Sequence, residues 1–165
     1  MKLDERDKRH NTYGSSRFLV EPNVKESKGG LRDLHTLFWI GKYLFRTQAL
    51  DDLTKNDQFL TSSELNSFKK AEDFLWVVRC HLHFISNRDN EVLTFDKQLE
   101  LASRLGYAKR PGQKDVERFM KHYFMTAKEV GNLTRIVCAS LEKKSIKKDP
   151  TVYEVLDNLL SFRKK

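Results

Sequence analysis

The chain has 165 residues, of which 39% are hydrophobic and 33% charged, with only 7 glycines, 3 prolines and a formal net charge of +8. This length allows one domain with its own hydrophobic core but is short for a multidomain enzyme, and the composition is typical of a helix-rich globular domain rather than of a disordered segment. No apolar run approaches the roughly 18 residues that cross a bilayer, and the first ten residues lack a signal-peptide core, so we expect a cytoplasmic protein without a membrane partner.

The positive charge could indicate a nucleic-acid partner, because basic surfaces exchange counterions with phosphate. Much of the excess, however, lies in residues 143–148 and in the last three residues, and such runs are usually solvated helix ends or linkers. No helix-turn-helix, RRM or zinc-finger signature accompanies the charge, so we expect no nucleic acid.

The N-terminal residues 1–16 are charged and have no apolar stripe, which predicts an arm that needs another surface to lie on. After it, Pro22 restricts Glu21 to an extended conformation, so residues 18–23 are predicted to form the end of a strand. A basic loop with Gly29 and Gly30 follows.

Residues 31–45 carry apolar side chains at helical spacing and are predicted to form the first helix of the core. The clearest helix follows Thr61 or Ser62, either of which could cap it with help from Glu64. Its apolar positions recur at near-heptad spacing: Phe68, Ala71, Leu75, Val78, Leu82 and Ile85.

The C-terminal half predicts two further helices. Asp96 is expected to cap a short helix that ends at Gly106, and Asp115 is expected to begin a long helix that fades near Lys144. We therefore predict an all-α domain over residues 17–144, an antiparallel helical bundle with a short N-terminal extended segment, followed over 145–165 by a linker and a C-terminal amphipathic helix.

Most cysteines and histidines are expected to be structural. Cys80 and Cys138 belong to no C-x-x-C pair and are predicted to be reduced thiols. His81 and His83 are two residues apart on a helix, so they point to different faces and cannot form an i, i+4 metal pair. We therefore expect no metal site.

Two further patterns on the predicted helices have ordinary explanations. Trp39 and Trp76 fall on or beside apolar stripes, which favours core positions over a base-stacking platform. Glu72 and Arg79 are two turns apart, a spacing that favours a solvated face over a buried polar cluster.

The junction before residue 31 is the best candidate for a binding site. The helix that begins near Leu31 is expected to present unpaired backbone N–H groups, which favour anions, and Lys25, Lys28 and Arg32 add positive charge around it. The phosphate-binding candidates are Lys25, Gly29, Gly30, Arg32 and Asp33, supported by Glu21 and Asn23. On local pattern alone a simple turn with solvated lysines is favoured, because the segment matches neither of the standard glycine-rich nucleotide loops.

Four segments together resemble one known family. They are EPNVKESKGGLRDLHTLFWI (21–40), AEDFLWVVRCHLHF (71–84), FDKQLELASRLGY (95–107) and DVERFMKHYF (115–124). In this order they resemble the helical region that follows the nucleotidyltransferase domain in bifunctional PII uridylyltransferase/uridylyl-removing enzymes. The resemblance covers about Arg17 to Leu141.

The resemblance implies a helical domain packed against a nucleotidyltransferase domain, in an enzyme that uses magnesium to transfer UMP from UTP to PII and removes it in a separate HD domain. The chain itself shows neither the Gly-Ser and paired aspartates of the first domain nor the His-Asp doublet of the second, so we expect a fragment without catalytic residues or a cofactor of its own. The implied partners are the nucleotidyltransferase domain, PII and UTP. Lys25 and Arg32 would neutralise phosphate, Gly29 and Gly30 would allow its approach, and Asp33 would hold Arg32.

Two alternatives stay open at this point. The adenylyltransferase that modifies glutamine synthetase has a similar Lys, Gly-Gly, Arg, acidic pattern, although Glu21-Pro22-Asn23 and Leu34-His35 favour the uridylyltransferase. From another class, the chain could be a non-enzymatic helical module that binds a partner protein or an acidic polymer.

Overall fold

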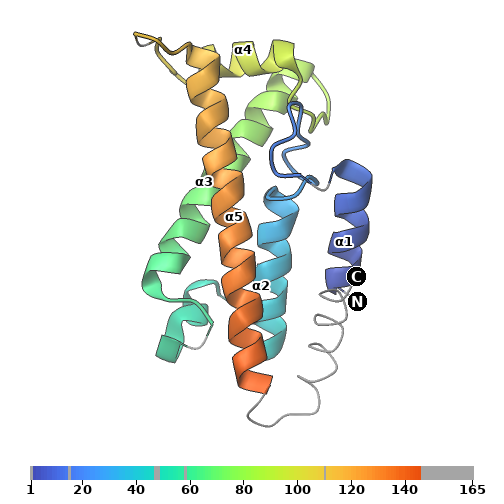
Figure 1. The fold of residues 1–165 in the computed structure, drawn as a ribbon, viewed down its shortest axis with the longest axis vertical. Helices are drawn as coiled ribbons and strands as arrows, with labels where there is room; N and C mark the ends of the chain where they lie inside the picture. Colours follow the sequence, from blue (N-terminus) through green and yellow to red (C-terminus); the bar gives the residue numbers. More distant parts are fainter. Residues whose placement is uncertain (1, 15, 47–48, 58, 110, 146–165) are drawn as a thin grey trace.

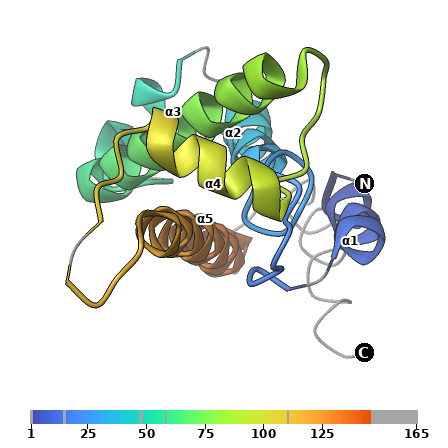
Figure 2. The same ribbon diagram turned by 90° about the horizontal axis from the view of Figure 1, so that it is seen from above.

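The structure is a computed structural model that describes residues 2–14, 16–46, 49–57, 59–109 and 111–145. Its elements are α1 (Lys2–Tyr13), α2 (Leu31–Phe45), the short 3-10 helix η1 (Asp51–Asp57), α3 (Ser62–Ser86), α4 (Phe95–Arg104) and α5 (Asp115–Ser145). Figure 1 shows α2, α3 and α5 side by side, and Figure 2 shows α4 crossing the end of this group. The all-α prediction is confirmed for these residues.

The core lies between α2, α3 and α5, with contributions from η1 and α4. Apolar residues at i, i+3, i+4 and i+7 form one face of each helix, and burying these faces together removes them from water. The α3 stripe is buried as predicted: Phe68, Ala71, Leu75, Val78 and Leu82 are at most 4% exposed. Ile85 is partly buried against the same core.

Two helix caps illustrate what local sequence can and cannot predict. The capping box of α3 is confirmed: the Glu64 N–H donates to Thr61 Oγ1 (3.2 Å), and the Thr61 N–H donates to Glu64 Oε2 (2.7 Å). The predicted Asp96 cap is wrong, because α4 begins earlier, with Thr94 at the N-cap position. There the Phe95 N–H donates to a carboxylate from a distant loop, Glu21 Oε1, at 2.9 Å.

The predicted strand over residues 18–23 is not formed. Among the described residues the only extended pairing here is an isolated antiparallel bridge between Asn23 and Val92. It is held by the Val24 N–H on Glu91 O (2.8 Å) and the Leu93 N–H on Pro22 O (2.9 Å). Pro22 lacks an N–H, so the pairing cannot extend through it, and no further strand lies alongside in this part of the chain.

The charged N-terminal segment forms α1, which lies beside α2 (Figure 1). Its Arg9 and His10 side chains are buried at this contact, so α1 is attached through polar groups rather than an apolar stripe. This explains why an apolar pattern did not predict the helix.

Several other expectations have defined outcomes. Cys80 is a free, exposed thiol on α3, whereas the Cys138 side chain and the predicted C-terminal helix lie outside the described residues. None of the helices in the described part of the chain combines the length and the apolar character that crossing a bilayer requires.

Candidate functional site

The loop before α2 is held by its own side chains. Asn23 Oδ1 accepts hydrogen bonds from the N–H groups of Lys25 (3.1 Å) and Glu26 (2.8 Å), an arrangement in which asparagine replaces a backbone turn. The Asn23 N–H donates to Ser27 Oγ (2.9 Å), and Ser27 Oγ–H donates to Tyr13 O at the end of α1 (3.1 Å). Asn23 therefore shapes the loop, and this supporting role does not require contact with a ligand.

The backbone N–H groups at the start of α2 are already used within the chain. The N–H of Leu31 donates to Val24 O at 3.1 Å. The N–H of Arg32 donates to Lys25 O at 3.0 Å, and that of Asp33 donates to another loop carbonyl at 3.0 Å. The expectation that this helix start presents unpaired N–H groups to an anion is therefore wrong, and a phosphate here would depend on side chains.

Gly29 and Gly30 allow other groups to come close to the loop backbone, but the groups that do so are backbone atoms of this chain rather than a ligand. Gly29 has a φ of +85°, and a Cβ at this position would lie 2.6 Å from the carbonyl oxygen of Ala127 on α5. A Cβ on Gly30 would lie 2.6 Å from Val24 O. Gly29 thus lets the loop pack tightly against α5, and Gly30 lets the loop close on itself.

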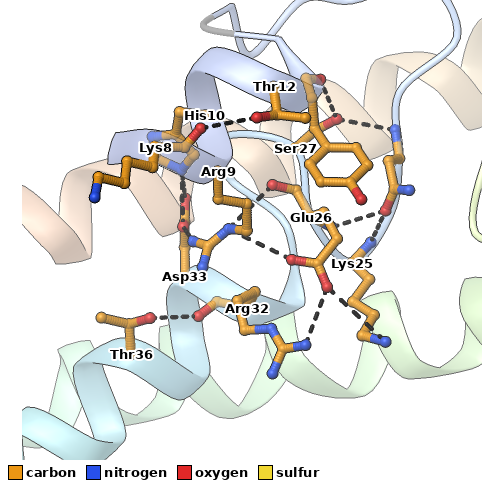
Figure 3. A network of polar contacts seen from close by, with 12 residues as sticks. Lys8, Arg9, His10, Thr12, Lys25, Glu26, Ser27, Arg32, Asp33 and Thr36 are labelled. Carbon is orange, nitrogen blue, oxygen red and sulfur yellow. Dashed lines mark hydrogen bonds and ion pairs between the residues drawn. The ribbon is translucent and has the colours of Figure 1, made fainter. Parts of the chain in front are cut away.

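Asp33 is buried, with 4% of its surface exposed, and binds two residues of α1 and one residue of the loop before α2 (Figure 3). The Gly29 N–H donates to Asp33 Oδ2 at 2.8 Å. His10 Nε2 lies 2.9 Å and 3.0 Å from the two carboxylate oxygens, and Arg9 Nη2 forms an ion pair with Oδ1. Burial raises the pKa of Asp33, but the contacts with His10, Gly29 and Arg9 outweigh it and hold the pKa below its ordinary value.

Arg32 is oriented by Glu26 rather than by Asp33, which corrects the predicted pairing. Arg32 Nη2 donates to Glu26 Oε1 at 3.0 Å, while 41% of the Arg32 side chain stays exposed. Glu26 also lies 3.6 Å from Arg9 Nε and 3.9 Å from Lys25 Nζ. Glu26 is therefore the carboxylate that holds the outer cations of the loop in place (Figure 3).

A second carboxylate, Glu91, extends this network to α3. Arg79 donates to both of the Glu91 oxygens, from Nε to Oε2 at 2.8 Å and from Nη2 to Oε1 at 2.8 Å, in the fork geometry that arginine and carboxylate favour. Lys25 Nζ lies 3.8 Å and His83 Nε2 3.4 Å from Glu91 Oε1. Burial raises the pKa of Glu91, but the Arg79 hydrogen bonds and the nearby cations outweigh it, so the pKa is lowered.

Sequence reasoning missed this pair. The spacing of Glu72 and Arg79 along one helix favoured a solvated face, but the partner of Arg79 is Glu91, in the loop after α3. Only the contact between α3 and the loop that follows it could reveal the pair. The sequence offered one indication: Arg79 lies within the matched segment 71–84, and Glu91 lies between this segment and the matched segment 95–107.

Both tryptophans are exposed, contrary to the expectation that they are core residues. Trp39 is 56% exposed and Trp76 38% exposed. The Arg79 guanidinium lies over the Trp76 ring, 4.9 Å from its centroid, and the His35 ring is 6.2 Å away. Burial and the cations Arg32, Arg79 and Lys25 lower the pKa of His35, which favours the neutral imidazole.

The remaining predicted residues do not converge on one point. Glu21 lies at the start of α4, where it accepts the Phe95 N–H, and does not reach the loop cations. Lys28 is half-buried in the loop and forms no ion pair with any residue that the structure describes. Lys25 and Arg32 are thus the two predicted cations that share a carboxylate and stay accessible.

The residues present do not fit a magnesium site. Across the described ranges, no group of three or more His, Cys, Asp or Glu side chains is arranged to hold a metal ion. The acidic groups nearest the loop, Glu26, Asp33 and Glu91, are each paired with arginine. Magnesium prefers oxygen ligands in near-octahedral geometry, so these occupied carboxylates are unsuited to it.

A shallow pocket between α3 and the start of α5 is a weaker candidate. Phe74, Leu105, Tyr107 and Arg118 line it. Its polar groups are already paired: the Tyr107 hydroxyl lies 2.5 Å from His122 Nδ1, and Arg118 Nη1 donates to a backbone carbonyl. Few polar groups remain there to orient a ligand.

Comparison with known proteins places the chain in a family. The model of the family described as GlnD PII-uridylyltransferase matches residues 1–138. The chain is 56% identical to a bifunctional uridylyltransferase/uridylyl-removing enzyme of Bradyrhizobium sp. (strain BTAi1) and 53% identical to one of Rhodopseudomonas palustris, each over 158 residues. These alignments cover 96% of the chain but only 17% of each relative, and no solved structure matches. The chain belongs to the PII-uridylyltransferase family, as its four matched segments predicted.

Proposed function

We propose that this chain is the helical domain of an enzyme that transfers UMP from UTP to PII, and that its loop before α2 supplies phosphate contacts beside a nucleotidyltransferase active site. The names of the relatives support the activity. The chain covers only 17% of each relative, which supports the idea that other domains carry the catalytic groups. The chain contributes no catalytic carboxylates in this scheme.

The observation that supports the site is the pair of accessible cations on a fixed loop. Arg32 uses Nη2 to bind Glu26, while 41% of its side chain is exposed. Arginine has five N–H donors, so the others can bind phosphate oxygens in a bidentate manner. Lys25 lies between Glu26 and Glu91 and adds a second charge on the same side.

The buried contacts hold the loop that carries these cations in one conformation. A cation fixed in this way loses less conformational entropy when a ligand binds. Asp33 ties the loop to α1 through Arg9 and fixes Gly29 by accepting its N–H. Asp33 is thus a positioning residue. The α2 dipole adds a modest favourable field for a phosphate near Arg32, although its first N–H groups are occupied.

The test is UMP transfer by a chimera in which this chain replaces the 56% identical segment of the Bradyrhizobium relative. Arg32→Ala should lower kcat/KM for transfer by at least about tenfold, which corresponds to about 1.4 kcal/mol of transition-state stabilisation, and should leave the melting midpoint nearly unchanged. Arg135→Ala, which removes an exposed arginine of α5, is the matched control and should retain full activity.

The opposite pattern would refute the site. If Arg32→Ala melts early while its folded fraction transfers UMP at the rate of the unaltered chimera, then Arg32 only maintains the contact between loop and bundle. The family assignment would stand, and the phosphate site would not.

A further inference from the structure

Trp76 on α3 is a large aromatic residue that is partly exposed and has a cation over its ring. Leu75 and Val78 of the α3 stripe are fully buried, whereas Trp76, with Val77, lies outside this stripe and is 38% exposed. The Arg79 guanidinium lies over its ring at 4.9 Å, and the two contacts of Arg79 with Glu91 fix that guanidinium. The indole is therefore held firmly while part of its surface remains open to solvent.

The same indole is linked to the cations of the loop through intermediate residues. Its ring lies 6.2 Å from the ring of His35, which follows Arg32 by three residues on α2. Residues three apart on a helix lie on the same face, with Cβ atoms about 5–6 Å apart. On the other side, Glu91 contacts both Arg79 and Lys25. Trp76 is thus linked to Arg32 through His35, and to Lys25 through Arg79 and Glu91.

A second exposed tryptophan provides a comparison. Trp39 on α2 is 56% exposed and has Lys42 over its ring at 5.3 Å. It lies a further turn away from Arg32, and Lys42 has no ion pair among the described residues that would fix it. Exposure is therefore common to both residues, but the contacts with His35 and with the Arg79 guanidinium that Glu91 fixes distinguish Trp76.

We propose that Trp76 is the stacking surface for the base of the nucleotide whose phosphates lie on Lys25 and Arg32. The assignment rests on the proposed function, since the phosphates must occupy the loop for the base to reach this ring. Base stacking on an aromatic side chain tolerates any base, because every base has a π face, so Trp76 would add affinity without by itself selecting uracil. The Arg79 cation over the ring keeps the indole in place, and the base would stack on the part of the indole that stays exposed.

The experiment is a titration of the isotope-labelled 165-residue chain by NMR, with UTP in one series and inorganic tripolyphosphate in another. The chain has two tryptophans, so its two indole N–H signals report separately on Trp39 and Trp76. Both ligands should shift the backbone amide signals of residues 25–32. Only UTP should shift the Trp76 indole, and neither should shift that of Trp39.

Variants make the comparison quantitative. Because UTP and tripolyphosphate differ in charge, the informative value is the ratio of their two dissociation constants in each variant. Trp76→Leu should reduce the preference for UTP by at least about fivefold, the lower end of what loss of one stacked base costs. Trp39→Leu is the matched control and should leave the ratio unchanged, and Trp76→Phe, which keeps an aromatic face, should retain most of it.

The outcomes separate this inference from the proposed function. If both ligands shift residues 25–32 but UTP leaves the Trp76 indole unmoved, the stacking role is wrong and the phosphate site stands. If neither ligand shifts residues 25–32, the phosphate site fails and the stacking role fails with it. A shift of the Trp39 indole alone would place the base elsewhere on α2 and also overturn the inference.

Discussion

Replacing Asp33 with asparagine tests whether the polar contact between α1 and the loop holds the fold together. The substitution keeps the size of the side chain but removes its charge, while Arg9 and His10 remain buried beside it. Removing one partner of a buried ion pair costs roughly 3–5 kcal/mol, because the other charge is left uncompensated. Glu26 still lies 3.6 Å from Arg9, so we expect a loss at the lower end, about 3 kcal/mol at neutral pH.

The effect should depend on pH in a defined direction. The pKa of Asp33 in the folded protein is lowered, so its carboxylate contributes stability above the pKa of the unfolded chain, about 3.9, and loses it as the pH falls through the folded value. The difference in free energy of unfolding between the wild type and Asp33→Asn should therefore be largest near neutral pH and shrink below about pH 4. His10 and Arg9 of α1 face this carboxylate, and Glu26 lies behind Arg9.

Urea titrations followed by far-UV circular dichroism give the free energies, with Asp73→Asn as the control. Asp73 is an exposed carboxylate on α3, so its substitution should change stability by less than about 0.5 kcal/mol. Equal midpoints for the two variants, or a gap between wild type and Asp33→Asn that widens in acid, would refute the assignment of Asp33 as the anchor of α1.

Three further predictions concern packing and activity. In the same urea titration, Leu75→Ala should destabilise the chain by about 2–5 kcal/mol, because Leu75 is fully buried, and Lys70→Ala by less than about 0.5 kcal/mol, because Lys70 is exposed. Similar losses of unfolding free energy in the two variants would contradict the core described here. Gly29→Ala should lower the free energy of unfolding by about 1–3 kcal/mol more than Gly112→Ala, because both glycines have positive φ but only a Cβ on Gly29 would press against Ala127. Equal falls in the melting temperature of the two variants would show that this contact is absent. Finally, the chain alone, incubated with UTP, magnesium and PII, should leave PII unmodified by mass spectrometry, and uridylylated PII would show that it carries catalytic groups of its own.

The elements with a strong local pattern could be predicted from the sequence. The apolar stripe of α3 and its Thr61–Glu64 capping box depend on residues within a few positions of one another, so their spacing is sufficient. The long helix from Asp115 follows the same logic. The loop before α2 could also be located, because its glycines and lysines are adjacent in sequence.

The parts that depend on distant contacts could not be predicted from the sequence. The start of α4 is stabilised by Glu21, which is separated from Phe95 by 74 positions and replaces the expected Asp96 cap. Likewise, Asp33 is next to Arg32 in sequence but binds Arg9 and His10, because the charged N-terminal segment folds back onto α2.

The tryptophans show a different limit. Spacing predicted that Trp39 and Trp76 lie on or beside the core stripes, but a residue at the edge of such a stripe can face either the core or the solvent. The contact of Arg79 with Glu91, on which the position of the Trp76 ring depends, is formed between α3 and the loop that follows it. Packing between segments, not helical periodicity, determined the outcome.

The central claim is that the loop before α2 contacts the phosphates of the nucleotide, and a structure of a complete member of the family with a non-transferable UTP analogue tests it most directly. We predict that the side chains corresponding to Lys25 and Arg32 lie at ion-pair distance, about 2.7–2.9 Å, from phosphate oxygens, while Glu26 still holds the arginine. A structure in which the phosphates contact only the nucleotidyltransferase domain, and these two cations contact only protein, would contradict the claim.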